Sequence, residues 1–502
     1  MSERPSFPRI CIALGFPSVE KLLQHANLET LAGETFLEFR LDHLPDTAAG
    51  VEAIRRFLKD HPDCSILATC RRHQNHGKFN GSIEEQVRIL LAAIDAGARA
   101  VDLEIESAES GLVSLDALRG GAVLIVSYHN YDGTPALDAV VRRMSKVPAA
   151  AYKIVTTAHK PSDNLRVLSL AKSLTRTPVV MLAMGETGFP TRVLSTALGG
   201  LYTYAAPNAA TGTAAGQASA HQLRHTFRLE KFTRDARIYG VVADPVRHSL
   251  SPAVHNRAFQ VRRIDAVYLP FLVKSGQLRD FFSFARDLPV AGFSVTLPHK
   301  QKVVRCLDIV DPLARRIGAV NTVWRKAGKW RGANTDAQGV VKPLSKRLRL
   351  SKATVLLVGN GGAARSAAYA LSEAGAKLSI AGRNVDRVRA LAKACGAEPL
   401  AASQYLARRF DAVVHATPLG MFPHIDECFF PGAIPAGVVF DMVYNPFETL
   451  LLRRAREQNL QIVPGLEMFI EQAAQQFEIW TGESSPRAAM EKAAREALAT
   501  PQ

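Results

Sequence analysis

Residues 354–364 read TVLLVGNGGAA, an apolar run followed at once by a turn of small residues. The turn fits the pattern G-x-G-x-x-A, in which small side chains let the backbone approach a pyrophosphate at the start of a helix. A tight turn that binds nothing is the alternative. About 350 residues precede the stretch, which is room for two further domains of ~150 residues each. We therefore expect a nucleotide-binding βα unit of the Rossmann type, with the nucleotide held by Gly359, Asn360, Gly361, Gly362, Ala363 and Ala364.

The composition is that of an ordinary globular enzyme. The 502 residues carry a net charge of +16, from 62 Lys and Arg against 46 Asp and Glu. Because the basic residues are scattered among acidic ones, attraction of small anions explains this charge better than binding of a nucleic acid. No presequence and no span of about 20 apolar residues is visible, so we expect a cytoplasmic chain that does not enter a membrane. Six cysteines show neither CxxC pairs nor zinc-finger spacing, which predicts free thiols and no metal site: Cys11, Cys64, Cys70, Cys306, Cys395 and Cys428.

The first 220 or so residues alternate short strand-like runs with longer helical patterns. Eight strands in βα alternation are the number that closes a (β/α)₈ barrel, whereas an open doubly wound sheet does not need eight. The sequence therefore predicts an α/β chain that begins with a barrel. The expected strands are 9–15, 36–42, 65–71, 100–106, 123–129, 150–156, 178–184 and 201–206.

Charged residues in these strands mark one end of the predicted barrel. Glu38 and Arg40 have the same parity in the second strand, so their side chains point to one side. Burying such groups is costly unless they meet each other or a ligand. Arg71, His129 and Lys153 also lie at or near predicted strand ends. A barrel gathers those ends in one mouth, which is where such folds carry out chemistry.

Two further patterns follow a linker at 207–233 that is rich in Ala, Thr and Gly and then basic. A mixed α/β pattern comes first, a Rossmann-like pattern second, and the last 35 residues are expected to be helical. The strands expected in these patterns are 238–242, 266–271, 292–296 and 319–324, then 354–358, 377–382, 411–416 and 438–443. The expected domains are the barrel at 1–225, a catalytic domain at 235–340 with 466–500, and the Rossmann domain at 341–465.

Two arginines indicate which nucleotide the Rossmann pattern binds. The strand after the glycine turn ends at Arg383, where an acid would accept the ribose hydroxyls of NAD. An arginine suits the 2′-phosphate of NADP instead, with Arg387 one helical turn further on. The alternative is that both arginines are solvated surface residues. We favour NADP.

The second half of the chain resembles the shikimate dehydrogenase family over about residues 238–482. The resemblance rests on GxxxDPxxHSLSPxxHN at 240–256, SVTLPHK at 294–300, GAVNT at 318–322, NTD at 334–336, HATPLGM at 415–421, DMVYNP at 441–446 and GxxM…Q at 465–472. It implies Lys300 and Asp336 as the catalytic pair. It also implies substrate contacts from Ser249, Ser251, Thr296, Asn321, Tyr444 and Gln472, and cofactor contacts from Thr417, Gly465 and Met468. Without the resemblance, Ser249 and Ser251 are equally well explained as helix caps.

The first half is similar to type I 3-dehydroquinate dehydratases. The matching residues are Glu38–Asp42, Thr69-Cys70-Arg71, Ser127-Tyr128-His129, Lys153, Met184-Gly185, Arg192 and Gly216-Gln217. The resemblance implies an imine between Lys153 and a substrate ketone, with burial favouring the neutral amine. It implies His129 as general base and acid, and Arg192 as the partner of the substrate carboxylate. The residues implied to hold the rest of the ring are Glu38, Arg40, Arg71, Thr213 and Gln217.

As a whole, the chain resembles bifunctional enzymes that join these two families in this order. The implied substrates are 3-dehydroquinate, 3-dehydroshikimate and shikimate, with NADP as cofactor. Three positions depart from the family patterns. Asn75 stands where dehydratases commonly have an acid that orients the histidine, Ser294 stands where dehydrogenases usually have Asn, and Pro418 removes a hydroxyl. The first departure predicts weaker support for a charged His129.

Two other functions fit the same resemblance. A quinate-pathway regulator has similar domains without turnover, but it is expected to lack the nucleophile or the proton donor, and this chain keeps Lys153, His129, Lys300 and Asp336. A quinate dehydrogenase in the second half is the closer alternative, since the choice between quinate and shikimate depends on single hydroxyl contacts.

Overall fold

A computed structural model of the chain describes residues 5–174, 176–208, 212–214 and 216–499. The chain divides into two compact units, Met1–Ala236 with Pro270–Leu288 and Arg237–Leu269 with Pro289–Gln502. Within the described ranges, no helix is both long and apolar enough to cross a membrane.

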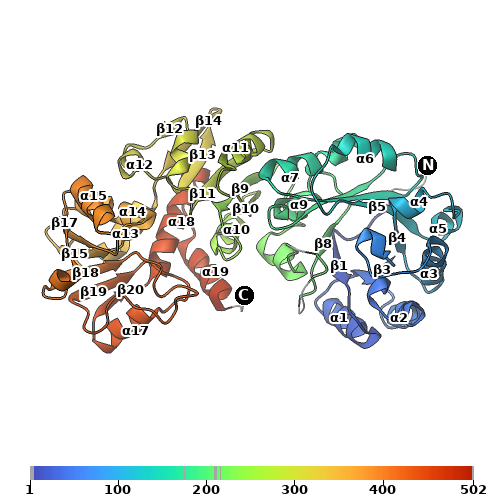
Figure 1. Ribbon diagram of the computed structural model, residues 1–502, viewed down its shortest axis with the longest axis horizontal. Coiled ribbons are helices and arrows are strands. Elements are labelled where there is room, and N and C mark those ends of the chain that lie inside the picture. The colour runs from blue at the N-terminus through green and yellow to red at the C-terminus, as the bar shows by residue number, and fades with distance from the viewer. Residues whose placement is uncertain (1–4, 175, 209–211, 215, 500–502) are drawn as a thin grey trace. The chain divides into compact units, whose positions relative to one another are not determined.

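The first unit contains the predicted barrel. Its eight strands are all parallel and follow one another in the order β7-β6-β5-β4-β3-β2-β1-β8. The amide of Leu201, just before β8, donates to Val179 of β7 at 2.8 Å, which brings the two free edges together in a near-closed ring. Helices surround the strands (Figure 1). The predicted (β/α)₈ architecture is confirmed.

The barrel strands are β1 Ile10–Leu14, β2 Phe36–Arg40, β3 Ser65–Thr69, β4 Ala100–Glu104, β5 Val123–His129, β6 Ala151–Thr157, β7 Val179–Met184 and β8 Thr203–Ala205. The helical elements of this part are α1 Val19–Leu31, η1 Leu41–His43, α2 Thr47–Asp60, η2 His73–Asn75, α3 Ile83–Asp95, α4 Ile105–Ala108, α5 Asp116–Gly121, α6 Leu137–Met144, α7 Pro161–Leu168, α8 Leu170–Ser173, α9 Phe189–Leu194 and η3 Gln222–Thr226. The predicted strands 36–42 and 65–71 are two residues too long at their ends, because the chain leaves the sheet at Arg40 and Thr69 to enter the loops of the barrel mouth.

Alternation along the strands separates the inside of the barrel from its helical coat. One parity faces the axis, and large side chains from several strands fill the barrel there, among them Phe36, Tyr202 and Tyr204. Most of the interior is therefore a packed core, and polar groups are confined to the mouth.

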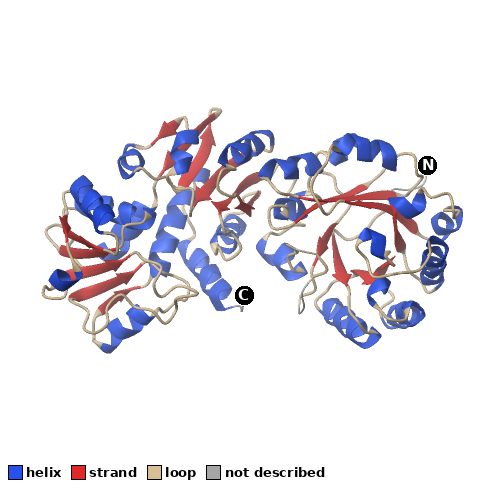
Figure 2. Ribbon diagram, viewed as in Figure 1, coloured by secondary structure: helices blue, strands red, loops and turns tan. Residues whose placement is uncertain are grey.

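The second unit is built on two six-stranded sheets (Figure 2). A mixed sheet has the order β10-β9-β11-β13-β14-β12, and a parallel sheet has the order β17-β16-β15-β18-β19-β20. Its strands are β9 Arg237–Ala243, β10 Ala266–Leu272, β11 Val290–Val295, β12 Ile309–Val310, β13 Thr322–Lys326, β14 Lys329–Ala333, β15 Thr354–Val358, β16 Lys377–Ala381, β17 Glu398–Pro399, β18 Phe410–His415, β19 Ala436–Asp441 and β20 Gln461–Val463. Its helical elements are α10 Ser251–Val261, η4 Lys302–Cys306, α12 Pro312–Ile317, α13 Asp336–Ser345, α14 Gly362–Glu373, α15 Val385–Cys395, α16 Ala402–Tyr405, α17 Leu450–Glu457, α18 Gly465–Thr481 and α19 Arg487–Ala499. Helix α11 Leu278–Asp287 belongs to the first unit. The predicted Rossmann pattern is confirmed.

Three predictions for the second half need correction. The strand expected at 319–324 begins only at Thr322, because α12 ends on the left-handed Gly318 and a loop follows it. The strand expected at 438–443 is β19, which begins and ends two residues earlier. The helical C-terminal stretch is interrupted, because α18 ends on the left-handed Gly482 and α19 begins at Arg487. The short strands β12, β14, β17 and β20 were not predicted.

Helix α18 joins the two sheets of this unit into one body. It contacts β11 and β13 of the mixed sheet and packs along α13, which leads into the parallel sheet. The two helices approach closely at Gly339, where an added Cβ atom would lie 3.1 Å from Met468 and 3.4 Å from Gln472. This packing places Gln472 beside the start of α13, where Asp336 lies.

Candidate active sites

The amine of Lys153 lies inside the barrel mouth among groups from three other strands. Lys153 is on β6 and only 4% exposed. Its Nζ donates to Asp102 of β4 at 3.0 Å and to the hydroxyl of Tyr204 of β8 at 2.9 Å. A second carboxylate, Glu38 of β2, lies 3.7 Å from the same nitrogen. The predicted buried lysine is therefore held in a polar network, not in an apolar pocket.

Asp102 is the group that connects the lysine to the rest of this network. It accepts hydrogen bonds from Arg71 at 2.8 Å and from Ser127 at 2.7 Å, in addition to Lys153. Burial alone would raise the pKa of Asp102, but the positive charges of Lys153 and Arg71 outweigh burial and hold that pKa below its usual value. Asp102 is thus a permanent negative charge beside the amine.

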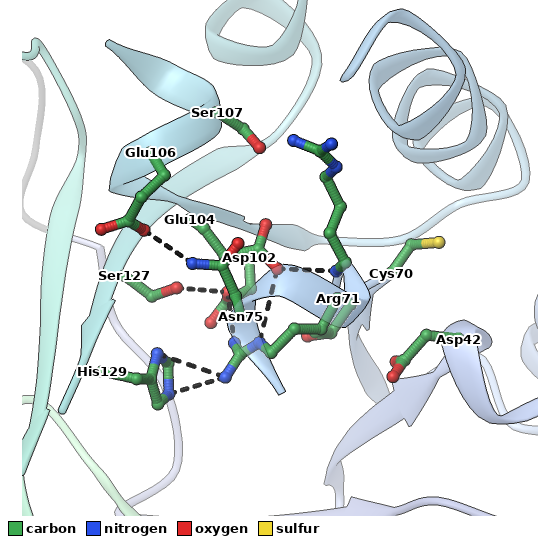
Figure 3. A network of polar contacts seen from close by, with 12 residues as sticks. Asp42, Cys70, Arg71, Asn75, Asp102, Glu104, Glu106, Ser107, Ser127 and His129 are labelled. Atoms are coloured by element: carbon green, nitrogen blue, oxygen red, sulfur yellow. Dashed lines mark hydrogen bonds and ion pairs between the residues drawn. The ribbon is translucent and has the colours of Figure 1, made fainter. Parts of the chain in front are cut away.

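His129 ends β5 and faces the guanidinium of Arg71 (Figure 3). Nη1 of Arg71 lies 2.7 Å from Nε2 of His129. Because a guanidinium can only donate, the ring nitrogen that it meets carries a lone pair. Burial lowers the pKa of His129 well below 6.5, and the positive charges of Arg71 and Lys153 lower it further. The imidazole is therefore neutral and able to accept a proton.

The other residues predicted for the barrel site make contacts of their own. Arg40 makes two hydrogen bonds to Asp42, at 2.9 and 2.8 Å. Arg192 in α9 is buried, and burial lowers its pKa to about 10. Thr213 lies beside Gly15 at the end of β1, where an added Cβ atom would meet its methyl group at 2.9 Å. Gln217 accepts the amide of Ala214 within its own loop, at 3.1 Å.

Asn75 contacts a glutamate in this structure, not His129. Its side-chain amide donates to Glu106 at 2.9 Å, while the group that contacts His129 is Arg71 (Figure 3). The residue lies in the short helix η2, which ends on His76 in a left-handed backbone conformation. The weaker support for a charged His129 that the sequence predicts from this position stays a prediction.

Sequence reasoning missed three residues of the barrel site, Asp102, Glu104 and Tyr204. Glu104 accepts the backbone amide of Arg72 at 3.0 Å and lies 3.6 Å from Arg71. Asp102 and Glu104 stand two residues apart in an otherwise apolar strand, so the parity argument that picked out Glu38 and Arg40 also applies to them. Tyr204 carries no such signal, because a tyrosine is an ordinary residue in a strand.

The second candidate site is centred on Lys300 and Asp336. Their side chains form an ion pair of 2.6 Å, and Asn321 donates to the other oxygen of Asp336 at 2.8 Å. The amide of Asn321 also points at Gln472 of α18, at 3.5 Å. Four residues predicted from separate motifs are thus brought together. A structure of this kind can hold a hydroxylated ring and move a proton at Lys300.

The remaining predicted substrate residues lie before or at the start of α10, directly after β11, and after β19. The hydroxyl of Ser249 accepts the amide of Ser251 at 3.3 Å, and Ser251 begins α10. Ser251 also contacts the hydroxyl of Tyr268, which meets Ser294 at 2.7 Å. Thr296 directly follows β11, and the half-buried Tyr444 stacks against Phe469 at 4.8 Å. Tyr268 was not predicted, although it connects two of these serines.

The small-residue turn after β15 has the geometry that a nucleotide needs. Gly359 has φ +128°, and an added Cβ atom would lie 2.6 Å from the carbonyl oxygen of Ala416, so only glycine fits. Gly361 and Gly362 face open space at the start of the 12-residue helix α14, where backbone amides can receive a pyrophosphate. Arg383 and Arg387 are exposed at the end of the next strand. These residues fit a phosphorylated dinucleotide.

Other residues predicted for the cofactor have structural duties of their own. Asn360 donates to the carbonyl of Asn384 at 3.3 Å, and Ala364 is fully buried against the sheet beside Ala363. Met468 packs into the core of the Rossmann sheet and is 8% exposed. Gly465 begins α18 where a Cβ atom would lie 2.4 Å from the carbonyl oxygen of Val443.

Thr417 is held by a buried histidine that the sequence did not single out. The hydroxyl of Thr417 lies 2.5 Å from Nε2 of His415, and Nδ1 of His415 lies 3.0 Å from Asp441. Asp441 also accepts the hydroxyl of Thr449 at 2.5 Å. The carboxylate of Asp441 can only accept, so Nδ1 of His415 donates a hydrogen bond to it. Nε2 of the neutral ring then accepts a hydrogen bond from the hydroxyl of Thr417, which fixes the orientation of that hydroxyl.

Comparison with known families assigns both halves of the chain. Residues 10–233 match the Type I 3-dehydroquinase family. Residues 241–323 match the Shikimate dehydrogenase substrate binding domain, 342–419 the Shikimate / quinate 5-dehydrogenase family, and 465–495 the Shikimate 5'-dehydrogenase C-terminal domain.

Two curated relatives match along nearly the whole chain. One is the chloroplastic bifunctional 3-dehydroquinate dehydratase/shikimate dehydrogenase of Arabidopsis thaliana, 34% identical over 95% of this chain and 83% of the relative. The other is the shikimate biosynthesis protein AroDE of Chlamydia pneumoniae, 33% identical over 94% of this chain and 95% of the relative. Among solved structures, shikimate 5-dehydrogenase of Thermus thermophilus in complex with NADP(H) and shikimate is 35% identical, with a TM-score of 0.50 over 52% of this chain and all of that one.

Proposed function

The chain belongs to the family of bifunctional 3-dehydroquinate dehydratase/shikimate dehydrogenases, and on that premise we propose how its residues perform two successive reactions. The barrel at 1–225 dehydrates 3-dehydroquinate to 3-dehydroshikimate. Residues 235–340 with 466–500 then bind 3-dehydroshikimate, which is reduced to shikimate with NADPH bound by residues 341–465. The observation that supports this proposal most directly is that each half holds a lysine beside a carboxylate, Lys153 beside Asp102 and Lys300 beside Asp336.

Dehydration proceeds through a Schiff base on Lys153. The neutral amine attacks the substrate ketone, and loss of water gives an iminium that acidifies the neighbouring carbon. Asp102 at 3.0 Å and Glu38 at 3.7 Å from Nζ stabilise the positive charge of that iminium. The network that holds the ammonium in the resting protein is therefore complementary to the charged intermediate as well.

His129 removes the proton from the acidified carbon. Its pKa is lowered by burial and by Arg71, so the ring is neutral and ready to accept. The same ring, once protonated, donates to the leaving hydroxyl. Arg192 receives the substrate carboxylate, because a buried guanidinium fork suits a bidentate pair with a carboxylate.

Reduction takes place at Lys300 and Asp336. Lys300 polarises the ketone and donates the proton to the oxygen that becomes a hydroxyl, and Asp336 orients the ammonium. Ser249 and Ser251 bind the carboxylate, and Thr296, Asn321, Tyr444 and Gln472 bind the ring hydroxyls. The turn at 359–364, Thr417, Arg383 and Arg387 would hold NADPH, which would supply the hydride.

Two assays on the purified chain test the proposal. With 3-dehydroquinate and borohydride, mass spectrometry of peptides is expected to find a reduced adduct on Lys153. With 3-dehydroquinate and NADPH, the absorbance of the reduced nicotinamide is expected to fall, and shikimate to accumulate. Absence of the adduct would disprove the barrel mechanism, and absence of nicotinamide oxidation would leave the regulator as the better account. Quinate oxidation faster than shikimate oxidation would identify the second half as a quinate dehydrogenase.

A further inference from the structure

Tyr204 is the closest polar neighbour of the Lys153 amine. It lies on β8, the last strand of the barrel, and is 5% exposed. Its hydroxyl accepts a hydrogen bond from Nζ at 2.9 Å, and the same nitrogen lies 4.3 Å from the centre of its ring. The assignments above leave this residue without a role.

The hydroxyl of Tyr204 also bridges the amine to a carboxylate. It donates to Oε1 of Glu38 at 3.3 Å, while Nζ lies 3.7 Å from that oxygen, which is too long for a direct hydrogen bond. Thr69 donates to the same oxygen at 2.8 Å and holds the carboxylate in place. A continuous chain of hydrogen bonds therefore runs from Lys153 through Tyr204 to Glu38.

The two carboxylates beside Lys153 are suited to different tasks. The positive charges of Lys153 and Arg71 hold the pKa of Asp102 low against the effect of burial, so Asp102 stays an anion. Burial, with the negative charge of Glu38, raises the pKa of Tyr204 well above its usual value, so the phenol keeps a proton to donate. Asp102 can stabilise charge, and the path through Tyr204 can move protons. The remaining charged or titratable groups around the amine are Cys11, Arg71, His129 and Tyr202.

We propose that Tyr204 is a catalytic residue of the barrel, whose hydroxyl carries protons between Lys153 and Glu38 as the Schiff base forms and breaks. The inference rests on the proposed dehydratase function. In the forward step, an N–H bond of the ammonium breaks and its proton forms an O–H bond on Tyr204. The original O–H bond of Tyr204 breaks at the same time, and that proton passes to Glu38. An ammonium and a carboxylate become an amine and a carboxylic acid, with no net change of charge. When the carbinolamine loses its hydroxyl, the proton on Glu38 returns through Tyr204 to that hydroxyl, which leaves as water. Glu38 is then again an anion beside the iminium, and hydrolysis follows the same steps in reverse.

The test compares Tyr204→Phe with Tyr202→Phe in the full chain. The first variant removes the hydroxyl and keeps the ring over Lys153. The second removes a hydroxyl that lies 3.4 Å from that of Tyr204, in the same barrel core. The rate of Schiff base formation with 3-dehydroquinate is measured by timed reductive quenching and mass spectrometry across pH, and NADPH-dependent reduction of 3-dehydroshikimate by the same chain reports folding.

At neutral pH, Tyr204→Phe is expected to slow adduct formation by at least about 10²-fold, the lower end of the range for a lost proton-transfer group. The rate is expected to approach that of the natural chain as pH rises, because hydroxide then removes the ammonium proton. Tyr202→Phe is expected to behave as the natural chain does. A merely structural role for Tyr204 would not produce this pH dependence.

Unchanged rate and pH dependence in Tyr204→Phe would overturn the role of Tyr204 alone, provided that the natural chain forms the adduct. If the natural chain forms none, the proposed dehydratase mechanism and this inference both fail. Should Tyr204→Phe lose the reduction activity through misfolding, Glu38→Gln tests the other end of the same path. It is expected to show the same slow, pH-dependent adduct formation, and an unchanged rate there would overturn the inference.

Discussion

The two lysines of this chain occupy opposite kinds of environment. The side chain of Lys153 is 6% exposed and contacts groups from β2, β4 and β8, all inside one barrel. The side chain of Lys300 is 16% exposed and, among the described residues, forms an ion pair with Asp336 at 2.6 Å. The first lysine is surrounded by polar groups of the protein itself, and the second is the more exposed of the two.

This difference matches the chemistry proposed for each lysine. A covalent intermediate carries a positive charge on the lysine nitrogen, so fixed carboxylates around it lower the energy of the intermediate. A proton donor to a ketone needs access to substrate and one partner that orients it. The barrel holds Lys153 and its partners on alternate strands of one sheet. The second site draws Lys300, Asn321, Asp336 and Gln472 from loops and helices far apart in the chain.

The largest expected effect separates the two lysines. Lys153→Met is expected to lower dehydration by about 10⁴-fold or more, as removal of a nucleophile does, and to leave reduction unchanged. Lys300→Met is expected to lower reduction by roughly 10²–10⁴-fold and to leave dehydration unchanged. Each variant is the folding control of the other, and both activities are measured on the same preparation. Loss of both activities in either variant would mean that the two sites are not independent.

A smaller effect is expected at the nucleotide turn. Arg383→Asp removes a positive charge from the proposed 2′-phosphate site and is expected to raise KM for NADPH about tenfold, which corresponds to about 1.4 kcal/mol. KM for NADH is expected to fall or stay unchanged. Arg389→Asp is the matched control. Arg389 also lies in α15 and is exposed, and its ion pair with Asp386 is long, at 4.0 Å. An equal rise of KM for both dinucleotides in Arg383→Asp would show that this arginine does not read the phosphate.

The pH dependence of the barrel tests the neutral state of His129. Burial and the charges of Arg71 and Lys153 lower the pKa of His129, so the acid limb of kcat/KM for dehydration is expected below pH 6.5. Arg71→Met removes one of those positive charges and is expected to move the limb toward higher pH. The reduction activity provides a reference that Arg71 does not touch. A limb that moves toward lower pH in Arg71→Met would contradict the assigned cause.

The smallest effect is expected at Asn75. Asn75→Glu is expected not to reduce turnover of dehydration, and any change is expected to stay within about threefold, since ~0.6 kcal/mol is a typical surface effect. No gain in turnover is expected, because Asn75 donates to Glu106 and a carboxylate at position 75 would repel that of Glu106. Asn75→Glu combined with Glu106→Gln removes that repulsion and serves as the control. A collapse of activity in both variants would contradict this prediction, because it would mean that His129 depends on Asn75.

Much of the barrel site could be predicted because strands have a simple period. The parity of Glu38 and Arg40, and the position of His129 at a strand end, follow from alternation and from the number of strands. Lys153 lies inside β6 and not at its end as expected. What could not be predicted was the partner of each group. Arg40 pairs with Asp42, Lys153 with Asp102 and Tyr204, and Asn75 with Glu106.

The amino-acid sequence by itself determined the order of elements, the glycine turn at 359–364 and the residue types available for chemistry, because these depend on neighbours a few positions away. The tertiary structure alone decided that Tyr204 meets both Lys153 and Glu38, residues 51 and 166 positions away along the chain. Such contacts depend on the register of every strand between them and on closure of the ring. A local period says which way a side chain faces, and only the packed barrel says what it faces.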